Sequence, residues 1–187
     1  QMRTVVITGS EGNIGTYIVR RLQETQPDLR IIRVGRKPRE VKNYYAGDLL
    51  DASFVKKIYA ENEIDYVIHA ASETYGAAIY QSSPYEILAG DAMCLLNVLD
   101  ASREVKKFIY LSSAAVYESV AKTPFSEDET AIPSPQSPYG ISKLFGEQAI
   151  AQFGRQFAVP YTIWRGFNIV STLESHDTEG GHVFVDF

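Results

Sequence analysis

Two side chains that could act together in proton transfer, Tyr139 and Lys143, stand four residues apart just after Ser137 and Pro138. Serine is a favoured helix N-cap and proline suits the first helical position, so a helix is predicted to begin here. Residues four apart lie on one helix face. The pKa of a phenol is about 10. A nearby ammonium stabilises the phenolate and lowers this pKa towards neutral pH. The pair is therefore a candidate acid–base site; the alternative is a surface helix carrying an exposed tyrosine and a solvated lysine.

A second candidate site lies near the start of the chain. The apolar pattern of a buried strand at 4–8 (TVVIT) runs directly into a glycine-rich loop, and helical spacing follows over 14–23. A glycine loop between a strand and a helix suits a dinucleotide pyrophosphate, because it permits close backbone approach and the helix N-terminus favours negative charge. The alternative is a turn without a ligand. The predicted phosphate-binding residues are Gly9, Gly12, Asn13, Ile14 and Gly15.

The residues after two later strands bear on the adenosine end of such a ligand. NAD-binding folds place an acid about 20 residues after the glycine loop, but Gly35 stands at that point and Arg36 and Lys37 follow it. A guanidinium can chelate a 2′-phosphate, so this pattern favours NADP over NAD. The alternative is that both cations are solvated, with Arg36 stacking on adenine. Asp48 could accept from the adenine amino group with Leu49 packing nearby, or could simply cap a turn.

The elements that must position these residues alternate along the chain. Nearly continuous apolar strands followed by helices predict an α/β fold, with a doubly wound parallel sheet covered by helices on both faces. Strands are predicted at 4–8, 29–34, 65–70, 107–111 and 161–164, with a further short strand before Asp48. Helices are predicted at 14–23, 51–62, 84–104 and 138–157.

Composition excludes several classes of function. The chain has 187 residues and a formal net charge of −5, which gives no electrostatic reason to bind nucleic acid or anionic membrane. The single cysteine, Cys94, fits a reducing compartment. No stretch reaches the roughly 18 apolar residues of a transmembrane helix, and the start lacks a signal pattern. His176 and His182 have no metal-ligand spacing with Cys94. A cytoplasmic protein without a metal site is therefore expected.

Six motifs in fixed order give the chain a family resemblance over nearly all of residues 3–170. They are ITGSEGNIG (7–15), GDLLD (47–51), VIHAAS (67–72), LSSAAVYE (111–118), SPYGISK (137–143) and WRGFN (164–168). With these motifs the chain resembles the extended short-chain dehydrogenase/reductase family, in particular its nucleotide-sugar epimerases, dehydratases and ketoreductases. The fold that this resemblance implies is of the Rossmann type.

The resemblance implies roles for the matched positions. Tyr139 would be the catalytic acid/base, Lys143 would lower its pKa and hold the nicotinamide ribose, and Ser113 would hydrogen-bond the reacting oxygen. The cofactor would be lined by Ala70, Ala71 and Ser72, with Phe167 and Asn168 towards the nicotinamide and the substrate. Tyr75, in the loop after 67–72, is a candidate substrate contact, with packing at the rim as the alternative.

The sequence departs from the family pattern in four places. Gly35 replaces the acid of NAD-binding members, Asp91 stands where many relatives have an asparagine, and residues 169–172 replace a tyrosine-glycine-proline turn. The C-terminal lobe that holds most of the nucleotide-sugar is essentially absent. The expected division is an NAD(P)-binding Rossmann domain at 1–170 and the start of a substrate lobe, or an unfinished segment, at 171–187.

Together these features predict an NAD(P)-dependent oxidoreductase, epimerase or dehydratase that acts on a nucleotide-activated sugar by hydride transfer. The cofactor is expected to be NADP, with NAD as the alternative. The helices at 84–104 and 138–157 could form a homodimer interface, as they do in relatives. Two other functions fit the same residues: a non-catalytic dinucleotide sensor or scaffold, and a reductase of a small non-sugar carbonyl compound.

Overall fold

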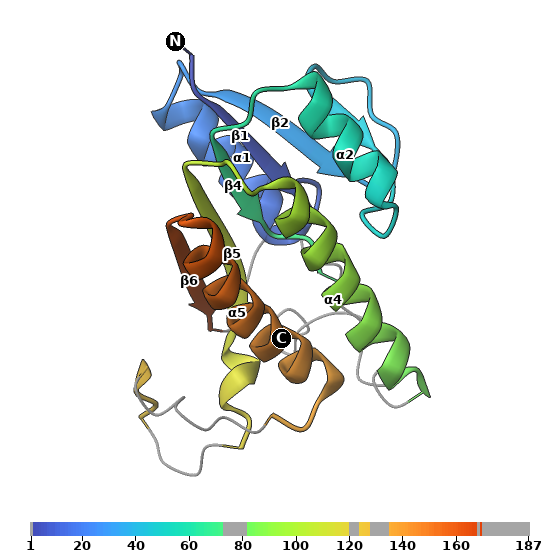
Figure 1. Ribbon diagram of the computed structural model, residues 1–187, viewed down its shortest axis with the longest axis vertical. Helices are drawn as coiled ribbons and strands as arrows, with labels where there is room; N and C mark the ends of the chain where they lie inside the picture. The colour runs from blue at the N-terminus through green and yellow to red at the C-terminus, as the bar shows by residue number, and fades with distance from the viewer. Residues whose placement is uncertain (1, 73–81, 120–123, 128–134, 168, 170–187) are drawn as a thin grey trace, which may run out of the picture.

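Six parallel strands form one sheet, in the order β3-β2-β1-β4-β5-β6, within the part of the chain that the structure describes. The computed structural model describes residues 2–72, 82–119, 124–127, 135–167 and 169 (Figure 1). The strands are β1 (Thr4–Thr8), β2 (Arg30–Gly35), β3 (Tyr44–Ala46), β4 (Tyr66–His69), β5 (Lys107–Ser113) and β6 (Tyr161–Gly166). The helices are α1 (Asn13–Thr25), α2 (Ala52–Glu61), α4 (Pro84–Ala101), the short 3-10 helix η1 (Ala114–Tyr117) and α5 (Pro138–Phe157).

The predicted doubly wound α/β arrangement is confirmed. Starting from β1, the chain adds β2 and β3 on one side, and then crosses to add β4, β5 and β6 on the other. The carboxyl ends of β1 and β4 are neighbours at this reversal, which is where ligands bind in open parallel sheets. The predicted division at residue 170 stays a prediction, because residues 170–187 lie outside the described part.

Two apolar clusters cover the two faces of the sheet. One packs the sheet against α2, α4 and α5, and Phe108, Leu95 and Ile150 are buried in it. The other packs the opposite face against α1 through Ile7 and Val19. Figure 1 shows the same arrangement, with α1 behind the sheet and α2, α4 and α5 in front of it. Burial on both faces explains why the strands read as continuous apolar runs rather than alternating ones.

Element ends differ from the sequence expectation where backbone pairing outlasts the apolar pattern. The pattern predicts that β5 stops at Leu111, but the parallel ladder with β6 continues and pairs Ser112 with Arg165 and Ser113 with Gly166. Helix α4 ends at Ala101 rather than at 104, because the Ser102 backbone N–H donates to the Leu99 carbonyl at 2.9 Å, which tightens the last turn at the C-cap. The bounds of α5, and its Ser137 N-cap, are as predicted.

A buried ion pair joins α5 to the sheet edge near the end of β5. Glu147 on α5 accepts from the Arg165 guanidinium of β6 at 2.7 and 2.8 Å, and from the Ser112 hydroxyl at 2.5 Å. The same guanidinium donates to the Tyr117 hydroxyl of η1 at 2.8 Å. The Glu147 side chain is 5% exposed, so the carboxylate depends on these donors for solvation. The network fixes α5 against β5, β6 and η1.

Replacement of Glu147 by Gln tests this network. It leaves the partly buried Arg165 charge without its anion, so we expect the free energy of unfolding to fall by about 3 kcal/mol. Urea unfolding of both proteins at neutral pH measures the change. Glu104→Gln, which alters an exposed acid after α4, is the matched control and should cost less than about 0.5 kcal/mol. Equal losses in the two variants would contradict the structural role of Glu147.

Candidate active site

The glycine loop after β1 touches the chain that follows β4. Gly9 has a φ of +66°, and a Cβ there would lie 2.7 Å from the Ala71 backbone. A Cβ on Gly15 would overlap the Gly9 carbonyl oxygen. Helix α1 begins directly after Gly12, whose lack of a side chain leaves the helix N-terminus without a side-chain cap. Backbone N–H groups at such a helix start bind phosphate, so the loop fits a dinucleotide pyrophosphate.

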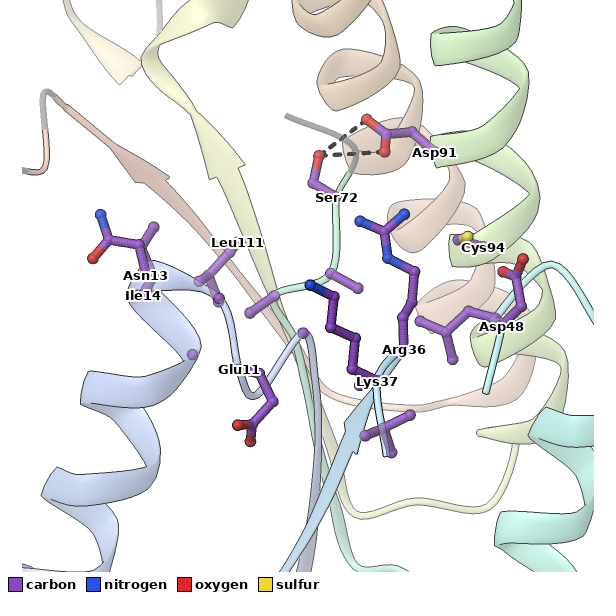
Figure 2. A pocket seen from close by; sticks show the side chains of 18 of the residues that line it. Glu11, Asn13, Ile14, Arg36, Lys37, Asp48, Ser72, Asp91, Cys94 and Leu111 are labelled. Carbon is purple, nitrogen blue, oxygen red and sulfur yellow. Dashed lines mark hydrogen bonds between the residues drawn. The ribbon is translucent and has the colours of Figure 1, made fainter. Parts of the chain in front are cut away.

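A cavity of about 480 Å³ opens at this reversal of strand order. Figure 2 shows many of its lining side chains, which come from the glycine loop, the ends of β2 and β4, α4 and the segment after β3. Most of the predicted cofactor residues line it: Gly9, Gly12, Asn13, Ile14, Gly15, Arg36, Lys37, Asp48, Leu49, Ala70, Ala71, Ser72, Tyr139 and Lys143. The predicted substrate residues Tyr75 and Asn168 lie outside the described part of the chain.

Tyr139 and Lys143 stand on one face of α5, at the cavity wall. The Lys143 ammonium donates a hydrogen bond of 3.1 Å to the Leu111 carbonyl, and its Nζ lies 5.4 Å from the centroid of the Tyr139 ring. The Lys143 side chain is almost completely buried. Burial lowers the pKa of Lys143 to about 8, and the negative charge of Asp91 acts against this shift.

Asp91 connects three elements around this pair. From α4, its carboxylate accepts from the Ser72 hydroxyl after β4 at 3.1 Å and from the Ser142 hydroxyl of α5 at 2.8 Å (Figure 2 shows the Ser72 contact). Asp91 also lines the cavity. Asp91, at the position where the resemblance leads us to expect an asparagine in many relatives, therefore places a negative charge close enough to act on Lys143.

Two residues to which the resemblance gives a role do not line the cavity. Ser113 ends β5, and its hydroxyl accepts from the Ala115 N–H at 3.2 Å, so it caps η1. Its neighbour Ser112 does line the cavity. Phe167 is half exposed and stacks on Tyr117, with ring centroids 5.7 Å apart. Contacts of Ser113 and Phe167 with substrate and nicotinamide stay predictions.

The end of the cavity where the sequence predicts adenosine to bind holds the predicted cations and one turn carboxylate. Arg36 and Lys37 extend from the end of β2 into the region drawn in Figure 2. Asp48 accepts from the Leu50 N–H at 2.9 Å, which is the turn cap that the sequence allowed. Asp48 also lines the cavity, so the structure allows the predicted contact with adenine as well. That contact stays a prediction.

The structure adds lining residues that the sequence did not single out. Glu11 lies beside the end of β2 and forms ion pairs with Arg33 at 3.4 Å and Arg39 at 3.2 Å. Glu11, Arg39 and Tyr44 all line the cavity. One available signal was the position of Glu11 directly before the second glycine of the loop. No sequence pattern links it to Tyr44, which the β2–β3 pairing brings close.

His69, which the sequence assigns to packing, is buried beneath the site. Its Nδ1 lies 2.8 Å from the Thr8 hydroxyl, and burial lowers its pKa to about 3. Among the described residues there is no group of three side chains that could hold a metal ion. No helix in the described ranges is long and apolar enough to cross a membrane.

Comparison with known proteins agrees with this geometry. A model of the NAD dependent epimerase/dehydratase family matches residues 5–187. The chain is 32% identical over 171 residues to a putative UDP-arabinose 4-epimerase of Arabidopsis thaliana, covering 90% of this chain and 36% of the relative. It is 31% identical over 188 residues to the UDP-glucose 4-epimerase of Erwinia amylovora, covering 92% and 55%. The chain thus spans only about a third to half of these relatives.

Solved structures give the same result. The UDP-glucose 4-epimerase of Thermotoga maritima, determined with UDP-glucose, superposes with a TM-score of 0.83 at 28% identity, over 95% of this chain and 60% of that one. The enzyme of Bifidobacterium longum, in complex with NAD+ and UDP, superposes with a TM-score of 0.71 at 28% identity, over 87% and 52%. The family model matches nearly the whole chain, and the fold and the cavity agree with it. The chain therefore belongs to the NAD dependent epimerase/dehydratase family.

Proposed function

We propose that the full-length protein catalyses the NAD(P)-dependent 4-epimerisation of a UDP-sugar. The observation that carries the proposal is the Tyr139–Lys143 pair, which stands on one helix face at the wall of a cavity fitted for a dinucleotide. The reaction is chosen because the relatives reported above are UDP-sugar 4-epimerases. Dehydration or net reduction of a keto-sugar would use the same pair, so identification of the product separates these reactions.

In the proposed chemistry, the side chains of this protein move one proton. A bound nicotinamide dinucleotide supplies the acceptor and donor of hydride. The Tyr139 oxygen takes the proton of a sugar hydroxyl as the carbon is oxidised, and returns it to the oxygen when the carbon is reduced. The Lys143 ammonium, held by the Leu111 carbonyl, stabilises the Tyr139 phenolate. In this scheme Ser113 hydrogen-bonds the reacting oxygen.

Two groups of charges compete to select the cofactor. Arg36 and Lys37 line the cavity and support the NADP preference that the sequence predicts. Glu11 lines it too, and a carboxylate opposes the 2′-phosphate that distinguishes NADP. The relatives belong to a family described as NAD dependent, which supports NAD for this protein.

An apolar strip supports the homodimer expectation. On α4, Met93 and Leu96 are exposed, and on the neighbouring α5, Ile141 and Phe145 are exposed. Side chains of this type gain free energy when a second copy covers them. We propose that α4 and α5 of two copies pack together across this strip.

Substitution of Tyr139 by Phe tests the catalytic assignment in the full-length protein. Loss of the proton-transfer group should lower the rate of UDP-galactose and UDP-glucose interconversion by at least about 100-fold. Binding of NADH, followed by fluorescence, should change by less than about twofold. Tyr161→Phe, which alters an exposed tyrosine of β6, is the matched control. A sensor or scaffold would show no interconversion in the wild type, and its cofactor affinity and biological output would not depend on the Tyr139 hydroxyl.

The lowered pKa of Lys143 gives a pH dependence of stability with a defined sign. Between about pH 8 and the ordinary lysine pKa of 10.5, the unfolded chain holds a proton that the folded chain lacks. The free energy of unfolding of the wild type, relative to Lys143→Met, should therefore rise across this window, by at most about 1.4 kcal/mol per pH unit. Urea unfolding at pH 8 and pH 10 measures it. A relative stability that falls as pH rises would contradict the burial of this ammonium.

Introduction of a charge into the exposed strip tests the homodimer. Leu96→Glu should shift the full-length protein from dimer to monomer in sedimentation velocity, because a carboxylate buried between two copies would lack a partner. The matched control is Val41→Glu, whose side chain is 44% exposed, against 45% for Leu96, and lies in the segment between β2 and β3. A wild type that is monomeric throughout the concentration range, or equal effects of both variants, would refute the interface.

A further inference from the structure

We propose that Glu11 supplies the carboxylate that binds the adenosine ribose, and that it directs this site to NAD rather than NADP. The inference rests on the proposed binding of a dinucleotide in the cavity. It replaces the preference for NADP that Gly35 and Arg36 suggested from the sequence, and it names a residue that selects the cofactor from within the glycine loop.

The usual place for the ribose-binding acid is closed in this chain. Acids of NAD-binding folds stand at the end of the second strand, where β2 ends with Gly35. A Cβ at this position would overlap the Tyr44 hydroxyl oxygen. That hydroxyl donates to the Lys37 carbonyl at 2.7 Å, so the ring is held in place. With Tyr44 in this position a glycine fits at 35 and an acid there would displace the Tyr44 hydroxyl, which gives the missing acid a reason other than a site for a 2′-phosphate.

Glu11 brings a carboxylate to the same place from the other side. Its Cγ lies 3.2 Å from the position that a Cβ of residue 35 would occupy. The Glu11 side chain therefore lies beside the point from which an acid at position 35 would extend. Glu11 directly precedes Gly12 and lines the cavity, so the phosphate loop and the ribose acid come from one segment.

Nearby cations hold this carboxylate in position. Arg33 contacts Oε1 at 3.4 Å and Arg39 contacts Oε2 at 3.2 Å, and the Ser10 hydroxyl donates to Oε1 at 3.3 Å. Each carboxylate oxygen has two acceptor sites, so capacity remains for the ribose hydroxyls. A 2′-phosphate at this point would meet a like charge, and Arg33 and Arg39 already contact that charge.

Arg36 stands on the other side of the cavity. In Figure 2 the side chains of Arg36 and Glu11 point in opposite directions, and Asp48 lies on the Arg36 side. This placement suits the second role that the sequence allowed for Arg36, stacking on adenine next to an Asp48 acceptor. A residue in that role contributes to the binding of NAD and NADP alike.

The test is a fluorescence titration of NADH and NADPH against the full-length protein, freed of any copurified cofactor. We expect the dissociation constant of NADPH to exceed that of NADH by at least about tenfold in the wild type. Glu11→Gln removes the charge and keeps the shape, and it should lower the ratio of the NADPH constant to the NADH constant by at least about tenfold. Glu40→Gln is the matched control, because it removes an exposed acid that does not line the cavity, and it should leave the ratio unchanged. Arg36→Ala should weaken the binding of NADH and NADPH by the same factor.

The outcomes separate the inference from the proposed function. Tighter binding of NADPH by the wild type, a ratio that Glu11→Gln leaves unchanged, or a loss confined to NADPH in Arg36→Ala would each overturn the role of Glu11 while leaving a dinucleotide-binding protein. Failure of the wild type to bind either cofactor would overturn the proposed function itself. Thermal unfolding establishes that each variant is folded, and Glu11→Ser provides a second removal of the carboxylate should Glu11→Gln not fold.

Discussion

The close approach of the glycine loop to the segment after β4 is the constraint on which the rest of the site depends. The parallel pairing of β1 with β4 places these two strand ends side by side, and Thr8 pairs with His69 at the last step. The Gly9 backbone then lies against Ala71. A larger residue at position 9 would push the two strand ends apart and move the start of α1 away from the cavity. The position of the glycine loop and that of the cavity-lining residues after β4 thus depend on one backbone contact.

The polar groups buried beneath the site are each held by particular partners. Lys143 is held by the Leu111 carbonyl, and Glu147 by Arg165 and Ser112. His69, next to Thr8, is kept neutral, because burial lowers its pKa far below neutrality. Groups buried in this way lose solvent stabilisation and depend on particular partners. Their positions are therefore tied to the packing of α5 on β5, which also sets where Tyr139 stands.

The part of the cavity around Gly35 shows that a departure from the family pattern at one position is explained by residues at others. Taken alone, Gly35 looks like the loss of an acid. In the fold, Tyr44 fills the space beside it and Glu11 approaches from the loop after β1. This part of the cavity is therefore formed by residues from β2, β3 and the glycine loop together. In our proposal, selectivity between NAD and NADP depends on these residues together, and not on a single position.

The sequence by itself determined the alternation of strands and helices, the glycine loop and the start of α5 at Ser137, because local patterns encode them: apolar runs, glycine spacing and a serine cap before proline. Most of the residues that it predicted for the cofactor line the cavity, and many of them follow strands whose carboxyl ends meet. Only the tertiary structure decided that Glu11 and Tyr44 stand beside Gly35, that Asp91 joins Ser72 to Ser142, and that Ser113 caps η1. The contacts of Glu11, Tyr44 and Asp91 join residues from different elements, and no local pattern in a sequence records them. The Ser113 cap is local, but a serine at the end of a strand can also face a substrate, and only the structure shows which contact it makes here.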